Sequence, residues 1–526
     1  LVEISRLRAE AQLALGQRSQ AISSLQKVAE RKVNPRTPEE RYAWMGLNLQ
    51  LAELLGEHSA STRQARLRFE DVLRYSQDLE ETPSVLEAKA KALRGLIDDK
   101  DHKRSAQYLE QARLIFERLT KEGRNDLRPA YGDVIYRLAF LMEKMGRLDE
   151  CLVYTEQAIA IFTEFVASSE LYAHRAALAK LWLLRSRIEE LRGNYVEAEG
   201  FIAKSLEYYQ GLLQDNQVRF IADYAKVLAK RGSLRVLRQE YAAAKEDLEL
   251  SIEKWPGAHD LKNARAPLAR VFLNLAVSYA RLGNIPSALS QFEKGLVISE
   301  NRNDRNTCCQ VLSERVWVFF YDGQFKRAED DFSTIFNLRS EEANQASQLL
   351  GRGVARLQQE KNLPALSDFS QILMQGEEVN LSALLGSSLA HLGQGEREGT
   401  RSNGQKLLQK APPLAELNLE GVTRVCMAHW VLAQSLAEDD LAAALQHSAS
   451  ACQLWSEKAQ EDPNYLAEEE IFRALSVFFL QFPQLLFRGV QLLVKHGKLE
   501  GVVEPLRSAR NLGIQSAIFK LLPNYT

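Results

Sequence analysis

Cysteine is scarce in this sequence, with five residues among 526, and no two of them are spaced as Cys-x-x-Cys. This scarcity excludes a disulfide framework and a Cys-x-x-Cys zinc site, and it favours a reducing compartment. Cys308 and Cys309 are adjacent in a helical stretch. Neighbouring side chains on a helix point in different directions, so we expect these two to pack rather than to react.

Histidine is also rare, with eight scattered residues and no HExxH motif. Cys426 and His429 are three residues apart, so they could face the same way on a helix. Two ligands without further partners do not form a metal site. The sequence therefore predicts no metal ion and no cofactor.

An excess of charge of one sign is missing as well, because the formal net charge is −2. Nucleic-acid-binding and membrane-surface proteins usually need a basic excess, so we expect neither kind of partner. Nothing at the start has the basic–apolar–small layout of a signal peptide. Together with the few cysteines, these features favour a cytoplasmic protein.

Long unbroken apolar runs are absent. The most apolar stretch, residues 471–494, is interrupted by Arg473, Gln481, Pro483, Arg488 and Gln491. A membrane-spanning helix needs about 20 nearly continuous apolar residues. We therefore interpret this stretch as two buried helices that meet near Pro483.

Catalytic motifs are missing too. The string GQGEREGTRSNGQK (393–406) has Gly399 and Gly404 at the spacing of a phosphate-binding loop, but Gln405 stands where the lysine belongs. Such a loop also follows a strand, whereas here a helix is expected to end near Leu392. We interpret the string as an ordinary loop. No GxSxG motif and no acid–base–nucleophile set is recognisable, so we expect no enzyme and no catalytic residues.

What the sequence does contain is a repeat. The segment LNLAVSYARLGNIPSALSQFEKGLVIS (273–299) reads as two amphipathic helices around a turn, with a small residue at Ala276, a break at Gly283 and Ala288 and Phe292 beyond it. Similar segments recur at 137–162, 182–209, 229–256, 316–336 and 351–373. The small residue lets the second helix cross closely, and glycine at the break permits a left-handed turn.

This pattern resembles the tetratricopeptide repeat family. The resemblance is good over residues 131–375 and weaker outside, and it implies paired helices stacked into a right-handed superhelix. We therefore expect an all-α solenoid of about twelve hairpins without a β-sheet. The regular repeats at 126–378 would be flanked by irregular repeats at 1–125 and by degenerate repeats with a helical cap at 379–526.

The resemblance also implies a binding groove lined by the first helix of each hairpin, with a protein or peptide as its ligand. The cations expected there suit an acidic segment, and the aromatic residues suit an interface anchor. If the helical phase is shifted by one residue, Trp317 or the nearby Phe320 would instead belong to the core. The alternative for the lysines is that they are solvated surface charges. The expected groove residues are Tyr136, Lys180, Arg187, Lys226, Lys230, Arg270, Asn274, Arg281, Trp317 and Tyr321.

Two functions follow as hypotheses. The first is a non-catalytic scaffold that binds a protein, a peptide or another domain of its own polypeptide in this groove. The second is the sensor or regulatory arm of a bacterial effector, such as a signalling NTPase, a kinase or a caspase-like protease, with a role in phage defence. The second rests on two features. The repeats are long, with 47 residues from Cys151 to Ala198, and the chain begins at Leu1 without an initiator Met, as a piece of a longer polypeptide would.

Overall fold

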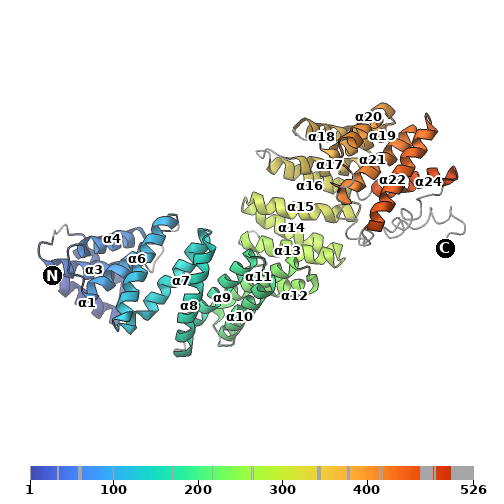
Figure 1. Cartoon of the computed structure of the whole chain (residues 1–526). Helices are drawn as coiled ribbons and strands as arrows, with labels where there is room; N and C mark the ends of the chain where they lie inside the picture. The colour runs from blue at the N-terminus through green and yellow to red at the C-terminus, as the bar shows by residue number, and fades with distance from the viewer. Residues whose placement is uncertain are drawn as a thin grey trace. The chain divides into compact units, whose positions relative to one another are not determined.

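The structure is a computed structural model in which the described residues form helices and no strand (Figure 1). It describes residues 2–31, 35–56, 62–98, 100–168, 171–215, 217–261, 264, 266–339, 345–375, 380–413, 416–417, 419–461, 478 and 481–498. The chain divides into two compact units, 1–256 and 257–526. The boundaries predicted at 125 and 378 separate regular from irregular repeats, whereas the two units are separated by their contacts. These predicted boundaries therefore stay a prediction.

The first unit consists of six antiparallel hairpins, each formed by two consecutive helices that pack along each other. Two short 3₁₀ turns precede the first helices of the fourth and sixth hairpins. The twelve helices are α1 (Val2–Ala14), α2 (Arg18–Ala29), α3 (Pro38–Gly56), α4 (Thr62–Ser76), α5 (Pro83–Gly95), α6 (His102–Lys121), α7 (Arg128–Lys144), α8 (Leu148–Ser168), α9 (Tyr172–Leu191), α10 (Tyr195–Gln214), α11 (Ile221–Leu237) and α12 (Tyr241–Lys254).

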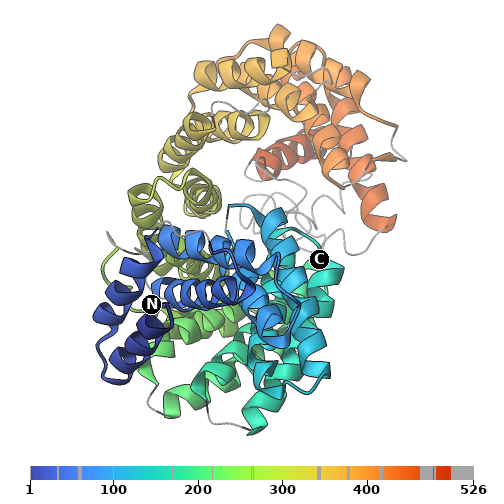
Figure 2. The same ribbon diagram turned by 90° about the vertical axis from the view of Figure 1, so that its left-hand side faces the viewer.

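The described residues of the second unit form five further hairpins and a helix, α24 (Gln481–Lys495), that packs on the last of them. Figure 2 shows these hairpins following one another around an arc, from olive through orange to red. The helices are α13 (Ala266–Arg281), α14 (Ile285–Asn301), α15 (Arg305–Tyr321), α16 (Phe325–Leu338), α17 (Ala346–Leu357), α18 (Asn362–Gln375), α19 (Leu381–Gln394), α20 (Arg397–Lys410), α21 (Leu419–Leu436), α22 (Leu441–Glu461) and α24 (Gln481–Lys495). The predicted all-α solenoid is confirmed.

The turn inside a hairpin has the conformation that the glycine pattern predicts. Gly283, between α13 and α14, has φ +79°, and the amide of the next residue, Asn284, donates to the carbonyl of Tyr279 at 2.9 Å. This closes the first helix through a left-handed residue and satisfies a carbonyl that would otherwise lack a partner. Gly146, Gly193 and Gly323 have the same positive φ at the corresponding turns.

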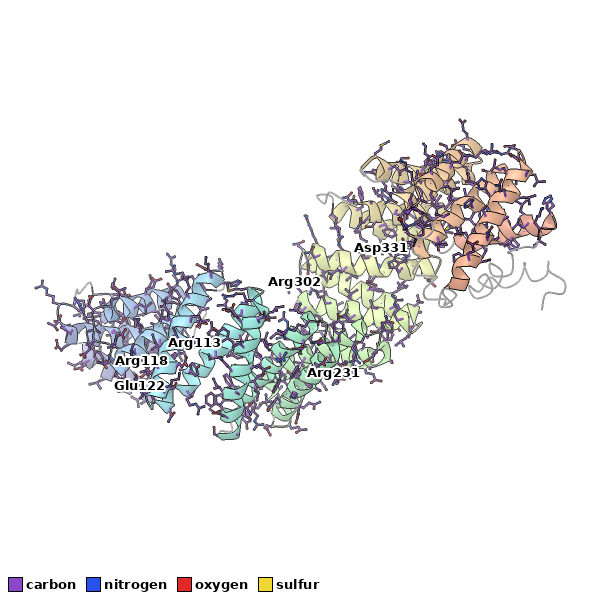
Figure 3. All side chains as sticks on the ribbon, in the orientation of Figure 1. Arg113, Arg118, Glu122, Arg231, Arg302 and Asp331 are labelled. Carbon is purple, nitrogen blue, oxygen red and sulfur yellow. The ribbon has the colours of Figure 1, made fainter. Side chains whose placement is uncertain are left out.

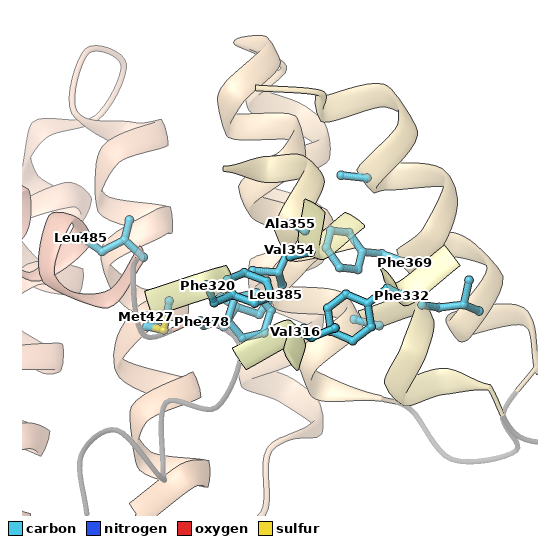
Figure 4. Packing of buried hydrophobic residues seen from close by; sticks show 14 of the residues in the cluster. Val316, Phe320, Phe332, Val354, Ala355, Phe369, Leu385, Met427, Phe478 and Leu485 are labelled. Atoms are coloured by element: carbon cyan, nitrogen blue, oxygen red, sulfur yellow. The ribbon is translucent and has the colours of Figure 1, made fainter. Parts of the chain in front are cut away.

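Small residues let aromatic side chains fill the space between hairpins. Phe369 on α18 is fully buried between Gly353 of α17 and Gly386 of α19. A Cβ atom at either glycine would lie 2.6 Å from the ring, so neither position tolerates a larger residue without repacking. Figure 4 shows this ring within the core of the second unit, beside Val354 and Ala355. Packing, rather than any binding role, therefore explains these glycines.

Arginine–aspartate pairs hold the two helices of several hairpins together. Arg231 of α11 makes two hydrogen bonds to Asp247 of α12, at 2.8 and 2.6 Å. Arg315 of α15 contacts Asp331 of α16 in the same bidentate way, at 2.9 and 2.7 Å. Figure 3 marks Arg231 and Asp331, each within its own unit. Burial raises the pKa of the Asp331 carboxyl, while Arg315 opposes that shift.

In parts of both units, the first helices form the inner face. Consecutive first helices contact one another directly in the pairs α1/α3, α3/α5, α13/α15, α17/α19 and α19/α21. The second helices of neighbouring hairpins, such as α2 and α4, do not contact one another in this way anywhere in the described residues from α1 to α22. Where the first-helix pairs occur, the hairpins are therefore closer together on the side of their first helices, so this side is the concave one there.

In the C-terminal third, one expectation is wrong, and others concern residues that the structure does not describe. The string 393–406 is not a loop, because Arg397–Lys410 forms α20 and only Gly395, with φ +75°, makes the turn. The second of the helices expected to meet near Pro483 is α24, whereas residues 471–480, apart from Phe478, lie outside the described part of the chain. Most of the predicted cap at 465–526 lies outside it as well.

Candidate partner-binding faces

In the first unit, the predicted residue Tyr136 lies on α7 and is half-buried. Its ring is 4.8 Å from that of Phe140 and 6.1 Å from that of Phe162, measured between centroids. Burial raises the pKa of its hydroxyl to about 12. Tyr136 is therefore neutral near pH 7, and part of its surface is packed rather than free.

Lys180 of α9 and Lys226 of α11 share one carboxylate. The Nζ of Lys226 lies 2.9 Å from Asp223, and the Nζ of Lys180 lies 3.6 Å from the same residue. Both lysine side chains keep more than two fifths of their surface exposed. Two cations beside one acid leave this part of the face with a local positive excess.

The remaining cations predicted in the first unit are paired with acids on neighbouring first helices. Arg187 of α9 lies 2.7 Å from Glu143 of α7. Lys230 of α11 forms an ion pair with Glu190 of α9. The face therefore carries charges of both signs. The sequence-based prediction named only its cations and not the acidic residues beside them.

In the second unit, three predicted polar residues lie on α13. Arg270 and Arg281 are exposed, and Asn274 is partly exposed. Arg270 lies near Asp304, which caps the N-terminus of α15; the hydrogen bonds of Asp304 to Thr307 lower the pKa of its carboxyl, and the charge of Arg270 adds to this effect. The three residues therefore lie on one first helix, with Arg270 beside the start of the next.

Glu314 of α15 is an acidic residue of this face that sequence reasoning missed. The surrounding protein raises the pKa of its carboxyl, and the charge of Arg281 opposes the shift. The side chain is nevertheless exposed. A group that water reaches from one side while protein surrounds the others is what a concave surface produces. Its position one helical turn before Trp317 was the feature of the sequence that could have identified Glu314.

The two aromatic residues for which core and groove were both open behave differently. Phe320 is 1% exposed and belongs to the core, where Figure 4 shows it close to Val316. Trp317 is 37% exposed, and its ring centroid is 6.0 Å from that of Phe320. Tyr321 is the last residue of α15, but its side chain lies outside the described residues. Of the pair, Trp317 alone offers an aromatic surface to a partner.

A hollow of about 630 Å³ opens where α17, α19 and α21 begin. Its walls include Leu350 of α17, Ser382 of α19 and Arg424 of α21. Arg424 forms an ion pair with Glu420 on its own helix, and burial lowers the pKa of its guanidinium. Sequence reasoning missed this hollow, although Arg424 interrupts an otherwise apolar stretch of α21.

Cys426 and His429 do not form a ligand pair. The thiol of Cys426 donates to the carbonyl of Ala451, while Nδ1 of His429 lies 2.9 Å from Nδ1 of His447 on α22. Within the described part of the chain, no group of three or more His, Cys, Asp or Glu residues could hold a metal ion. None of the helices described is long and apolar enough to cross a membrane.

Comparisons with known proteins give structural likenesses only. No protein-family model matches the chain, and no curated protein matches it. A tetratricopeptide repeat protein from Parabacteroides merdae is 17% identical over 56% of this chain and 96% of its own, with a TM-score of 0.40. The apo form of RapI is 14% identical over 78% and 98%, with a TM-score of 0.43. The apo form of the quorum sensor NprR from B. thuringiensis is 14% identical over 71% and 99%, with a TM-score of 0.41.

The fold is therefore assigned from the chain itself. The helix hairpins, their left-handed turns and the small residues at the helix crossings are those of a tetratricopeptide-like α-solenoid. At the identities found, the comparisons concern the fold and not a partner or an activity.

Proposed function

We propose that this protein is a non-catalytic scaffold that binds another protein, or an extended segment of one, on the faces of its first helices. The observation that carries the proposal is Trp317, a large aromatic side chain that stays 37% exposed on a concave face while Phe320, one turn further on, is buried. Tryptophan is among the residues most enriched at interface hot spots, because it buries a large area with little loss of conformational freedom.

The charges of the first unit support an acidic segment as one part of the partner. Lys180 and Lys226 share Asp223, so a carboxylate from a partner can bind one lysine without leaving Asp223 unpaired. Exposed ion pairs contribute about 0–1 kcal/mol each, so exchanging them costs little. The pairs Arg187–Glu143 and Lys230–Glu190 would fix the register of such a segment through alternating signs.

The experiment is affinity purification with the full chain, followed by quantitative mass spectrometry. One variant carries Lys180→Glu and Lys226→Glu in the first unit, and another carries Trp317→Ala and Arg270→Glu in the second. Matched controls are Lys27→Glu on α2 and Met374→Ala on α18, since both side chains are exposed on second helices.

We expect at least one of the two groove variants to lose a partner that the controls retain, with circular dichroism showing unchanged helicity. If both groove variants are folded and recover the same partners in the same amounts as the controls, the binding faces are assigned to the wrong residues.

A further inference from the structure

A second hollow, of about 390 Å³, lies in the second unit between α19, α21, α22 and α24. These four helices are labelled in Figure 1. Three small residues line the hollow, namely Ala433 of α21, Ala437 in the turn after α21 and Gly489 of α24. Gly489 packs directly on the buried Trp430, where a Cβ atom would come within 2.3 Å of the indole. The helices are therefore tightly packed beside the hollow, and the space is not a consequence of loose packing.

Two buried polar groups at this hollow have no hydrogen-bond partner. Ser448 of α22 lines the hollow and is completely buried, and its Oγ makes no hydrogen bond. Gln434 of α21 also lines it, and its Nε2 is buried without a partner. A buried polar atom without a partner costs about 1–3 kcal/mol in general, so a bound group that accepts hydrogen bonds from these two atoms would gain from both.

The third polar group is a cation. Nη1 of Arg488 donates to Oε1 of Gln434 at 3.1 Å, and a guanidinium has no acceptor, so the amide must present its NH₂ group to other partners. In the described part of the chain, no carboxylate lies within ion-pair distance of Arg488. The hollow therefore offers the donors of Arg488, Gln434 and Ser448, and no acid among the residues that the structure describes competes for them.

We infer that this hollow is a binding site for a carboxylate carried on a small branched aliphatic group. Three donors around one space match the two acceptor oxygens of a carboxylate. Leu392 and Leu492 provide apolar walls for the aliphatic part. The volume is near the lower end of the range of roughly 300–1,000 Å³ that is usual for small-ligand pockets. Neither this site nor its evidence depends on the proposed binding by the first-helix faces.

The same chemistry has two sources, a free carboxylic acid and the C-terminus of a peptide that ends in an aliphatic residue. The probes are 4-methylpentanoate for the first source and N-acetyl-Ala-Leu for the second, each paired with its neutral amide. Binding to the full chain is measured by saturation-transfer NMR and isothermal titration calorimetry. We expect at least one carboxylate to bind saturably, with a dissociation constant below about 5 mM, and its amide to bind at least tenfold more weakly.

Three variants test the site. Arg488→Gln should raise the dissociation constant at least tenfold, Ser448→Ala about fivefold, and Ala437→Leu should abolish binding because the leucine fills the hollow. Ser448→Ala should keep or slightly raise the melting temperature, since it removes a buried hydroxyl that has no hydrogen-bond partner in the free protein. Arg424→Gln, which removes a cation from the other hollow of the same unit, is the matched control and should bind as the wild type does.

The inference is overturned if neither carboxylate binds saturably, or if acid and amide bind equally well. It is also overturned if Arg488→Gln keeps the wild-type dissociation constant, or if Arg424→Gln weakens binding as much as Arg488→Gln does, since binding would then reflect net charge alone. The relative affinity of the two probes decides between a free acid and a peptide C-terminus.

Discussion

At the scale of single residues, a first-helix arginine contacts the second-helix residue sixteen positions later in several hairpins. The pairs are Arg231–Asp247, Arg315–Asp331 and Arg352–Asp368. Where the second residue is Phe201, Arg185 lies over its ring at 4.8 Å instead. The separation stays constant although the helices differ in length, because the small residue and the turn keep their spacing. The repeat therefore fixes which two positions are in contact, whereas the residue types at these positions differ between hairpins.

We expect Asp331→Ala to lower the stability of the hairpin α15/α16 by about 1–3 kcal/mol, since the largely buried Arg315 would keep only its contact with the exposed Glu293. The double variant Arg315→Leu with Asp331→Gln copies the pair that this chain itself uses at the same positions of α13/α14, Leu275 and Gln291. It should lose less than Asp331→Ala alone. Hydrogen–deuterium exchange of α15 and α16 measures both effects, and equal losses would contradict the prediction.

The histidine pair of the second unit predicts a dependence on pH. Burial lowers the pKa of His429 to about 4, with a further contribution from His447, and burial also lowers the pKa of His447. Their folded pKa values lie below the value of about 6.5 in an unfolded chain, so protonation favours unfolding. The stabilisation is complete above pH 6.5 and declines as the pH falls towards 4.

We therefore expect α21 and α22 to lose about 1–2 kcal/mol of stability between pH 7 and pH 5. Hydrogen exchange of these helices, corrected for the intrinsic effect of pH, gives the measurement. His429→Leu should flatten the dependence, whereas His259→Gln, at an exposed histidine of the same unit, should leave it unchanged. An equally steep dependence in His429→Leu would show that another group titrates.

At the scale of the elements, the hairpin turn is the most regular feature, and it does not always contain glycine. Gln239 between α11 and α12 has φ +63°, and Glu360 between α17 and α18 has φ +60°. The hydrogen bonds are nevertheless the usual ones, for example from the amide of Glu240 to the carbonyl of Arg235 at 2.8 Å. The surrounding helices therefore impose a left-handed conformation on side chains that disfavour it.

We expect Gln239→Gly to stabilise the hairpin α11/α12 by up to about 1 kcal/mol, because glycine adopts positive φ without a steric penalty. The reverse change at the equivalent turn, Gly193→Gln, should destabilise α9/α10 by a similar amount. A Cβ atom at Gly193 would meet nothing within 4 Å, so its effect is conformational only. Hydrogen exchange at the helix ends checks both variants. A destabilising Gln239→Gly would mean that the glutamine side chain has a role of its own.

The elements also indicate what a sequence of this kind can predict. Hairpins with a small residue, a glycine and an alanine in register were predictable, because each residue answers a steric need within a single hairpin. Helix α20 was not, because Gly399 and Gly404 suggested a loop. They serve close packing instead, against His391 and Leu432.

The candidate faces were less predictable than the fold. The cations could be placed on first helices from their phase, and Lys226 pairs with Asp223 on its own helix. The acids that meet Lys180, Arg187 and Lys230, however, belong to neighbouring hairpins: they are Asp223, Glu143 and Glu190. Which acid meets which cation depends on the rotation between hairpins, and no local pattern encodes this rotation. The 390 Å³ hollow depends on four helices at once, so it was beyond sequence reasoning altogether.

At the scale of the whole molecule, each hairpin contacts mainly its neighbours along the chain. The stability of such a protein is close to a sum of hairpin terms and nearest-neighbour terms, and unfolding need not be all-or-none. The two compact units, 1–256 and 257–526, provide a natural test of how far a local loss of packing spreads.

Phe369→Ala and Phe116→Ala form a matched pair for this test, since each removes a completely buried phenylalanine from a second helix of one unit. Each change should cost about 3–5 kcal/mol locally, through lost transfer free energy and the cavity left behind. The glycines that face Phe369, Gly353 and Gly386, cannot fill its cavity. Hydrogen exchange should therefore rise in α17–α20 for Phe369→Ala and in α5–α8 for Phe116→Ala, with the other unit unchanged in each case. If either variant exposed both units equally, the chain would unfold as one cooperative body, and the nearest-neighbour description would not hold for it.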